Sequence, residues 1–137
     1  MLPKLHQAVQ SEGLAAAVAE HLEQTKEHGP RLEDVFRALN AEPSSSLNPP
    51  VEKLAQHHDE LAENLADDRV ADVFHASAGA TTEHHELAAY DALLALSRAV
   101  ELSGDARGLL ERNRAEEEKA LHRLEGELER LAGALRA

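Results

Sequence analysis

RVADVFHASAGATTEHHELAAYDALLALSRAVEL, residues 69–102, determines the fold more than any other stretch of this sequence. Alanine and leucine supply most of its apolar side chains, and both are strong helix formers. It contains no proline, so nothing in it forces a helix to end. Apolar residues recur at steps of four and seven, as on one face of a helix, through Ala76, Ala80, Leu87 and Leu94. The stretch therefore predicts one long helix with one face in a core.

The composition of the whole chain extends this prediction to an all-α fold. The 137 residues are 42% hydrophobic but only 2% aromatic, and they include no cysteine, no tryptophan and no isoleucine. Residues that favour β-sheets are therefore scarce, which argues against a β-rich or an α/β fold. A chain of this length is most simply one domain, residues 1–137.

The net charge of the chain limits the kinds of partner that it can bind. There are 26 acidic and 14 basic side chains, which gives a formal net charge of −12. Such a surface repels nucleic-acid phosphates and anionic lipids, so we expect neither nucleic acid nor a membrane as a partner. No apolar run approaches the roughly 20 residues of a membrane span, and residues 1–10 lack a signal-peptide core. We expect a soluble cytoplasmic protein.

Four further helices follow from the same spacing rule. We expect a short helix over residues 2–9, a long one over 14–39 with Ser11 as its N-cap, one over 51–65, and one from about residue 106 to the end of the chain. In the helix over 14–39 the apolar stripe comprises Leu14, Val18, His21, Thr25, His28, Leu32, Val35 and Leu39. In the helix over 51–65 it comprises Val51, Leu54, His58, Leu61 and Leu65. In the last helix it comprises Leu110, Leu121, Leu124, Leu128, Leu131 and Leu135. Gly29-Pro30 interrupts the first stripe without changing its phase, so this segment is either one kinked helix or two nearly collinear ones.

The connections predict the topology. Residues 40–50, NAEPSSSLNPP, have the composition of a loop, and residues 103–105 form a tight turn. Two long helices joined by that turn, preceded by another long helix and a long intervening segment, indicate a ferritin-like four-helix bundle whose crossover holds an extra helix. The alternative is an ordinary up-down bundle with a decorated loop.

Polar side chains fall on the core faces of all three long helices. His21, Thr25 and His28 lie in the apolar arc of the first, with Gln24 beside the arc and Glu20 at its edge. The helix over 69–102 adds Glu83 and Tyr90 within the arc and Glu86 at its flank, and the last helix adds Glu117. A carboxylate that faces a bundle core is costly unless a cation, a proton or good donors meet it. Converging carboxylates and imidazoles are how di-iron and di-manganese bundles hold their ions, and Tyr90 could hydrogen-bond a ligating carboxylate.

Interpretations without a metal remain open for these residues. His28 lies about 10 Å along the helix axis from His21, so the two cannot share one ion, and it is as easily a hydrogen-bonded core histidine. Glu117 could pair with Arg114 or Arg98. Adjacent residues point about 100° apart on a helix, so at most one member of His57-His58 and of His84-His85 faces inward. The Glu-x-x-His pair typical of many di-iron bundles is missing after Glu117 and Glu118.

At these residues the sequence resembles the YciE/YciF-type family of ferritin-like bacterial stress proteins. The resemblance spans nearly the whole chain, through LPKL at residues 2–5, EHLEQTKEHGPRLEDVF at 20–36, EHHELAAYDAL at 83–93 and EEEKALHRL at 116–124. Its most specific piece is the Glu-His-x-Glu-x-x-x-Tyr pattern at Glu83, His84, Glu86 and Tyr90.

The resemblance implies a metal site at mid-bundle. It suggests His21, Glu83 and Glu86 as ligands, together with one or more of Glu117, Glu118 and His122, and helical phase favours Glu117. The sequence departs from the family in two ways. Gln24 stands where the family usually has a glutamate, and family members begin with about another 15 to 20 residues of a first helix that supplies an acidic ligand. We expect either an upstream start or a member with a shortened first helix, whose open groove a homodimer would cover.

Three functions remain at this point. The first is a ferritin-like stress-response protein that binds iron or manganese, or else zinc, through His21, Glu83, Glu86 and Glu117. In this hypothesis, alternative ligands, or residues that hydrogen-bond the ligating side chains, are Glu20, Gln24, Thr25, His84, Tyr90, Glu118 and His122. The second is a metal-free helical structural or oligomerisation module with a buried polar network. An enzyme that uses paired carboxylates as acid and base has the least support, because no pocket-forming motif accompanies them.

Overall fold

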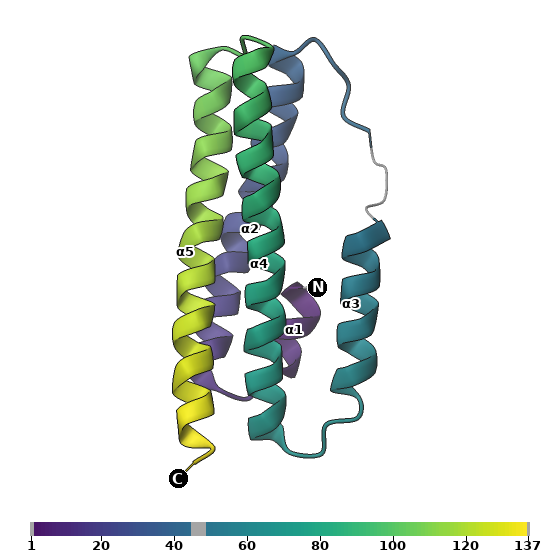
Figure 1. Cartoon of the computed structure of the whole chain (residues 1–137), viewed down its shortest axis with the longest axis vertical. Coiled ribbons are helices and arrows are strands. Elements are labelled where there is room, and N and C mark those ends of the chain that lie inside the picture. The colour runs from purple at the N-terminus through teal and green to yellow at the C-terminus, as the bar shows by residue number, and fades with distance from the viewer. Residues whose placement is uncertain (1, 45–48, 137) are drawn as a thin grey trace.

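The computed structural model describes residues 2–44 and 49–136 and confirms the all-α prediction. Within these residues it contains five helices and no strand (Figure 1). The helices are α1 Leu2–Ala8, α2 Glu12–Ala38, α3 Pro49–Ala62, α4 Asp68–Ala99 and α5 Gly104–Ala134. Part of the predicted connection over 40–50, residues 45–48, lies outside the described residues.

The three long helices stand side by side, and their directions give the topology. α2 and α4 run parallel and α5 runs antiparallel to both (Figure 1). The crossover that contains α3 returns the chain to the end of the bundle at which α2 began. α5 packs along both α4 and α2, α1 packs on α2, and α3 packs on α4. This is the bundle with a long crossover, and the up-down alternative is wrong.

Capping residues explain where the helices begin and end. Ser11, Asp67 and Ser103 are N-caps whose side chains accept hydrogen bonds from backbone N–H groups of the first turn. α2 and α4 each end in a paired Schellman pattern, with Asn40 and Glu101 in the left-handed conformation at φ 52°. These signals are local, which is why the predicted ends of the long helices are within three residues of the observed ones.

α2 is a single helix with Pro30 inside it, which settles the choice left open at Gly29-Pro30. In α3, predicted over 51–65 and observed over 49–62, the side chains of Val51 and Leu54 lie outside the described residues. Leu39, Leu61 and Leu135, predicted on apolar stripes, are instead about 40% exposed, at 44%, 42% and 38%. Leu39 and Leu135 are the C-cap residues of α2 and α5, where the helices reach past the core.

Two apolar clusters form the core and leave a polar layer between them. The cluster nearer α1 comprises Leu5, Val9, Leu14, Val18, Ala76, Ala80, Leu121 and Leu124. The cluster nearer the α4–α5 turn comprises Val35, Tyr90, Ala106 and Leu110. Between the two clusters the buried residues of α2 and α4 are polar, and on α5 they are polar except for Ala120; they include His21, Glu83 and Glu117. None of the helices in the described part of the chain is long and apolar enough to cross a bilayer.

Candidate metal centre

Four side chains from the three long helices meet in the polar layer. We call His21 of α2, Glu83 and Glu86 of α4, and Glu117 of α5 the carboxylate cluster. Each offers one potential ligand atom, and these atoms all lie within 4.8 Å of one another. His21, Glu83 and Glu117 are 4%, 1% and 1% exposed, and Glu86 is half-buried. The sequence predicted these four residues from helical phase, and the structure brings them together.

His21 lies between two carboxylates and satisfies neither. Its Nε2 is 3.2 Å from Oε2 of Glu83 and 3.2 Å from Oε2 of Glu117. One N–H cannot point at two acceptors, and both of these oxygens, with Nδ1 of His21, are buried polar atoms without a hydrogen-bond partner. Buried polar groups are nearly always hydrogen-bonded, so the two unpaired oxygens that face Nε2 need an explanation.

The ionisation of the cluster reflects its crowded negative charge. Burial, together with the charge of Glu117 and a hydrogen bond to it, raises the pKa of Glu86 to about 7. Burial works against protonation of His21, but the contact with Glu83 and the charges of the carboxylates outweigh it, so the pKa of His21 is raised. Both shifts show that the crowded carboxylates favour a positive charge among them, from a proton or from a cation.

A second polar group fixes Glu117 from the other side. Nδ1 of His28 lies 2.9 Å from Oε1 of Glu117, and Nε2 of the same ring lies 2.9 Å from Oε2 of Glu116. Arg31 extends the network, with Nη1 2.7 Å from Oε2 of Glu116 and 2.8 Å from Oδ1 of Asn113. Asn113 donates in turn to the Tyr90 hydroxyl at 3.1 Å. The network orients Glu117 toward His21 without using the oxygen that faces the cluster.

This network corrects one prediction and adds residues that sequence reasoning missed. The alternative pairing of Glu117 with Arg114 is wrong, because Arg114 binds Asp91 and Glu118 instead. Arg31 and Asn113 were missed as buried residues. Asn113 could have been found, since it falls on the last apolar stripe three residues after Leu110 and four before Glu117.

The remaining predicted residues lie around the cluster or away from it. Thr25 and Gln24 are half-buried, and the Thr25 hydroxyl donates to the His21 carbonyl at 2.9 Å. Glu20 forms ion pairs with Lys119 and Arg123. His84, Glu118 and His122 are exposed. The preference for Glu117 in the last helix therefore agrees with burial, and Tyr90 contacts the network through Asn113 rather than a carboxylate.

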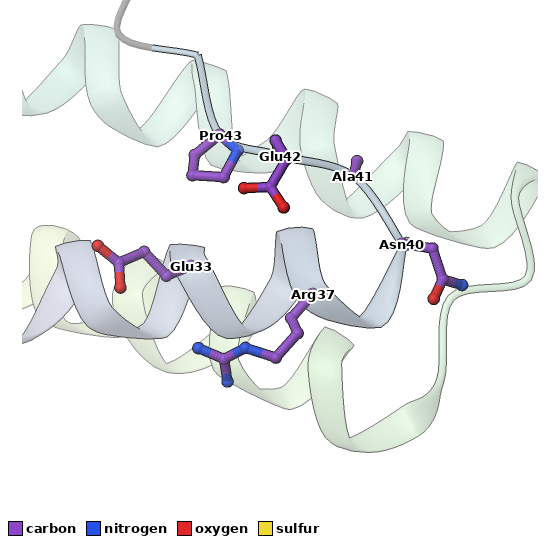
Figure 2. A pocket seen from close by; sticks show the side chains of 6 residues that line it. All are labelled: Glu33, Arg37, Asn40, Ala41, Glu42 and Pro43. Atoms are coloured by element: carbon purple, nitrogen blue, oxygen red, sulfur yellow. The ribbon is translucent and has the colours of Figure 1, made fainter.

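The cluster has access to solvent. A cavity of about 300 Å³ lies between α2 and α4, with Glu86 and Glu117 in its wall and Leu32, Ala89 and Leu93 among its other lining residues. A cavity of about 440 Å³ lies elsewhere, between the C-terminal turns of α2 and the loop residues 40–43 that follow them (Figure 2). Arg37 in its wall is paired with Asp34, and no metal-ligand cluster of the described residues adjoins it. The cavity beside Glu86 is therefore the relevant one.

Comparisons with known proteins agree with this architecture. The model of a family described as "Domain of unknown function (DUF892)" matches residues 1–135. The structure is similar to the Escherichia coli stress protein YciF, with TM-score 0.89 and 26% identity over 96% of this chain and 83% of that one. It is also similar to YcfI of Rhodopseudomonas palustris, proposed to be a structural protein, with TM-score 0.86 and 31% identity over 90% of this chain and 78% of that one. Among curated proteins no match was found.

Proposed function

The chain belongs to the DUF892 family, and we propose that its carboxylate cluster binds a divalent metal ion. The observation that carries the proposal is the convergence of one imidazole and three carboxylates, with their ligand atoms within 4.8 Å of one another and three of the residues fully buried. Desolvating such carboxylates is costly without a compensating charge, and a divalent ion between them would supply it.

The distances and the unpaired atoms suit one shared ion. Ligands about 2.0–2.2 Å from a metal, at angles between octahedral and tetrahedral, lie roughly 3.0–3.5 Å from one another. The two 3.2 Å separations from His21 Nε2 fall in this range. Binding would give partners to Oε2 of Glu83 and of Glu117 and would move the imidazole proton to Nδ1.

The donor set indicates the class of ion. Carboxylate oxygens suit manganese, and imidazole suits iron and zinc, so three carboxylates with one imidazole favour Mn²⁺ or Fe²⁺ over Zn²⁺. The four side chains suffice for one ion, while a binuclear iron or manganese centre would have to share Glu83 and Glu117 between two. Likeness to the E. coli stress protein YciF supports a role in a stress response.

A metal-free structural module is the second candidate. The observation that favours it is the continuous network from Glu117 through His28, Glu116 and Arg31 to Asn113, which links α2 to α5 with direct contacts. Such networks can fix the register of packed helices. YcfI, proposed to be a structural protein, is a relative that supports this reading.

Our proposal for the whole protein is a cytoplasmic homodimer. Leu93 and Leu96 of α4 and its C-cap residue Val100 are 43%, 60% and 59% exposed, which is high for large apolar side chains. Leu93 also borders the cavity that leads to the carboxylate cluster. A second copy of the chain that covered this face would shield both the exposed apolar side chains and the cavity from solvent.

Thermal unfolding of chelator-treated protein distinguishes the two candidates. With Mn²⁺, or with Fe²⁺ under anaerobic conditions, the metal-binding proposal predicts a higher Tm for the wild-type chain and for Glu118→Gln, whose side chain is exposed. Glu83→Gln and Glu117→Gln should show no such increase, and without metal Glu83→Gln should be at least as stable as wild type, because it removes a buried charge whose Oε2 has no hydrogen-bond partner. An unchanged wild-type Tm, with Glu117→Gln less stable than wild type, would support the structural module instead.

A further inference from the structure

We propose a second cation site, separate from the carboxylate cluster, in which His58 of α3 and His75 of α4 bind a transition-metal ion such as Zn²⁺. The sequence placed His58 on an apolar stripe and allowed at most one member of the His57-His58 doublet to face inward, and in the structure His58 is buried and His57 is exposed. His58 is 7% exposed and His75 is 4% exposed. The two residues are 17 positions apart in sequence, and their rings meet where α3 packs on α4.

The ring nitrogens are already at the spacing of two ligands of one ion. Nε2 of His58 lies 3.0 Å from Nδ1 of His75. Two nitrogens bound to one zinc ion at about 2.0–2.1 Å, at angles from 90° to tetrahedral, are roughly 2.9–3.4 Å apart. The His58 ring is held in place by stacking on Phe74, with ring centroids 5.1 Å apart and planes at 9°.

The neighbouring groups favour the tautomer that a metal needs. Nδ1 of His58 lies 3.4 Å from Oδ1 of Asp59, so this nitrogen carries the ring proton and Nε2 keeps its lone pair. Without a metal, Nδ1–H of His75 donates to that lone pair. When an ion binds, the His75 proton moves to its Nε2 and both facing nitrogens become ligands.

Space and charge for the rest of the coordination shell are present beside the rings. A cavity of about 270 Å³ is bordered by both histidines and by Asp59 and Glu63. Lys4 pairs with Asp59 at 2.8 Å, and the exposed Glu63 carboxylate also borders the cavity, so water would fill the coordination positions that the two histidines leave. A bound ion would fasten α3, and with it the crossover, to α4.

The experiment is a zinc titration of the unsubstituted, chelator-treated chain, followed by ¹⁵N NMR of the histidine rings. We expect zinc to shift the resonances of His58 Nε2 and His75 Nδ1, and His21 reports separately on the carboxylate cluster. Failure at one site therefore does not count as failure at the other. Ring resonances of His58 and His75 that stay unchanged at saturating zinc would overturn the proposal, whatever any variant does.

Two matched variants then test the assignment to His58. His58→Gln should abolish the zinc-dependent shift of His75, whereas His57→Gln, at the adjacent exposed position, should leave it as in the wild-type chain. A His75 shift that persists in His58→Gln would contradict the site, as would equal loss in both variants. Far-UV circular dichroism of each variant verifies that its helices are formed.

Discussion

Glu117 shows how much depends on a single carboxylate in this molecule. Its Oε1 faces His28 at 2.9 Å, while its Oε2 faces His21 at 3.2 Å without a hydrogen bond. The residue is 1% exposed, so its Oε2 is largely removed from bulk water and lacks a protein partner. One oxygen is thus held by the protein and the other is available to a ligand, which is the arrangement expected of a positioned metal ligand.

Glu116, the neighbouring residue, gives a prediction that does not depend on a metal. Despite partial burial, its contacts with Arg31, His28 and Arg112 lower its pKa to about 2, below the 4.5 of an ordinary glutamate. The folded state therefore binds this proton less readily than the unfolded chain, so the stabilisation is complete above about pH 5 and is lost as the pH falls toward 2.

We expect Glu116→Gln to lower the free energy of unfolding by at most about 3 kcal/mol at pH 6, and by clearly less at pH 3. Urea unfolding of both proteins at the two pH values measures this difference. Glu118→Gln is the control, since its carboxylate is exposed. A deficit in Glu116→Gln that is equal at pH 3 and pH 6 would show that the charge is not responsible.

At the scale of the helices, Gly79 lies where α4 packs against a side chain of α5. A Cβ at Gly79 of α4 would lie 3.1 Å from Cδ1 of Leu124 in α5, which is tighter than ordinary contact. A Cβ at Gly126 of α5 would meet nothing within 4 Å. The two glycines cost α4 and α5 similar helix propensity, but only Gly79 is needed for packing.

Gly126→Ala should therefore raise the free energy of unfolding by about 0.5–1 kcal/mol. Gly79→Ala should raise the free energy of unfolding by less than Gly126→Ala does, or should lower it, because the new methyl group must displace Leu124. Thermal and urea unfolding of the two variants under one set of conditions gives the comparison. An equal gain in both variants would mean that the α4–α5 interface has room at Gly79.

Helices and their core faces could be predicted here because both follow from local spacing. His21, Glu83 and Glu117 stood out as polar residues on apolar stripes, and the caps at Ser11 and Ser103 are sequence signals as well. Contacts between side chains of different helices could not be predicted. Periodicity indicates which face of its helix a residue occupies, but it does not give the axial register of one helix relative to another. This axial register determines that His28 faces Glu117, that Arg31 faces Glu116 and that His58 faces His75.

For the whole molecule, a single buried carboxylate joins the start of α2 to α4. Asp72 is 4% exposed and accepts backbone hydrogen bonds from Gln10 at 2.9 Å and from Ser11 at 2.7 Å. Ser11 caps α2 and also accepts a hydrogen bond from Arg130 of α5 at 2.7 Å. α2, α4 and α5 are thereby linked at the α1 end, where the larger apolar cluster lies.

We expect Asp72→Ala to cost about 2–4 kcal/mol, because it leaves two backbone N–H groups without their acceptor. Asp68→Ala is the matched control, since Asp68 lies one turn earlier on α4 and is exposed, and it should change stability far less. Urea unfolding at neutral pH measures both variants. Similar stability of the two would contradict the role of Asp72 as the link between α2 and α4.

Metal content tests the central claim about the whole molecule most directly. Protein purified without chelator and analysed for its elements should contain iron or manganese at about one ion per chain if the carboxylate cluster binds a single divalent ion. The same preparation of Glu83→Gln/Glu117→Gln should lack that metal, and Glu118→Gln should retain it. A wild-type chain that carries no metal, and takes up none when Mn²⁺ or Fe²⁺ is supplied, would contradict the account.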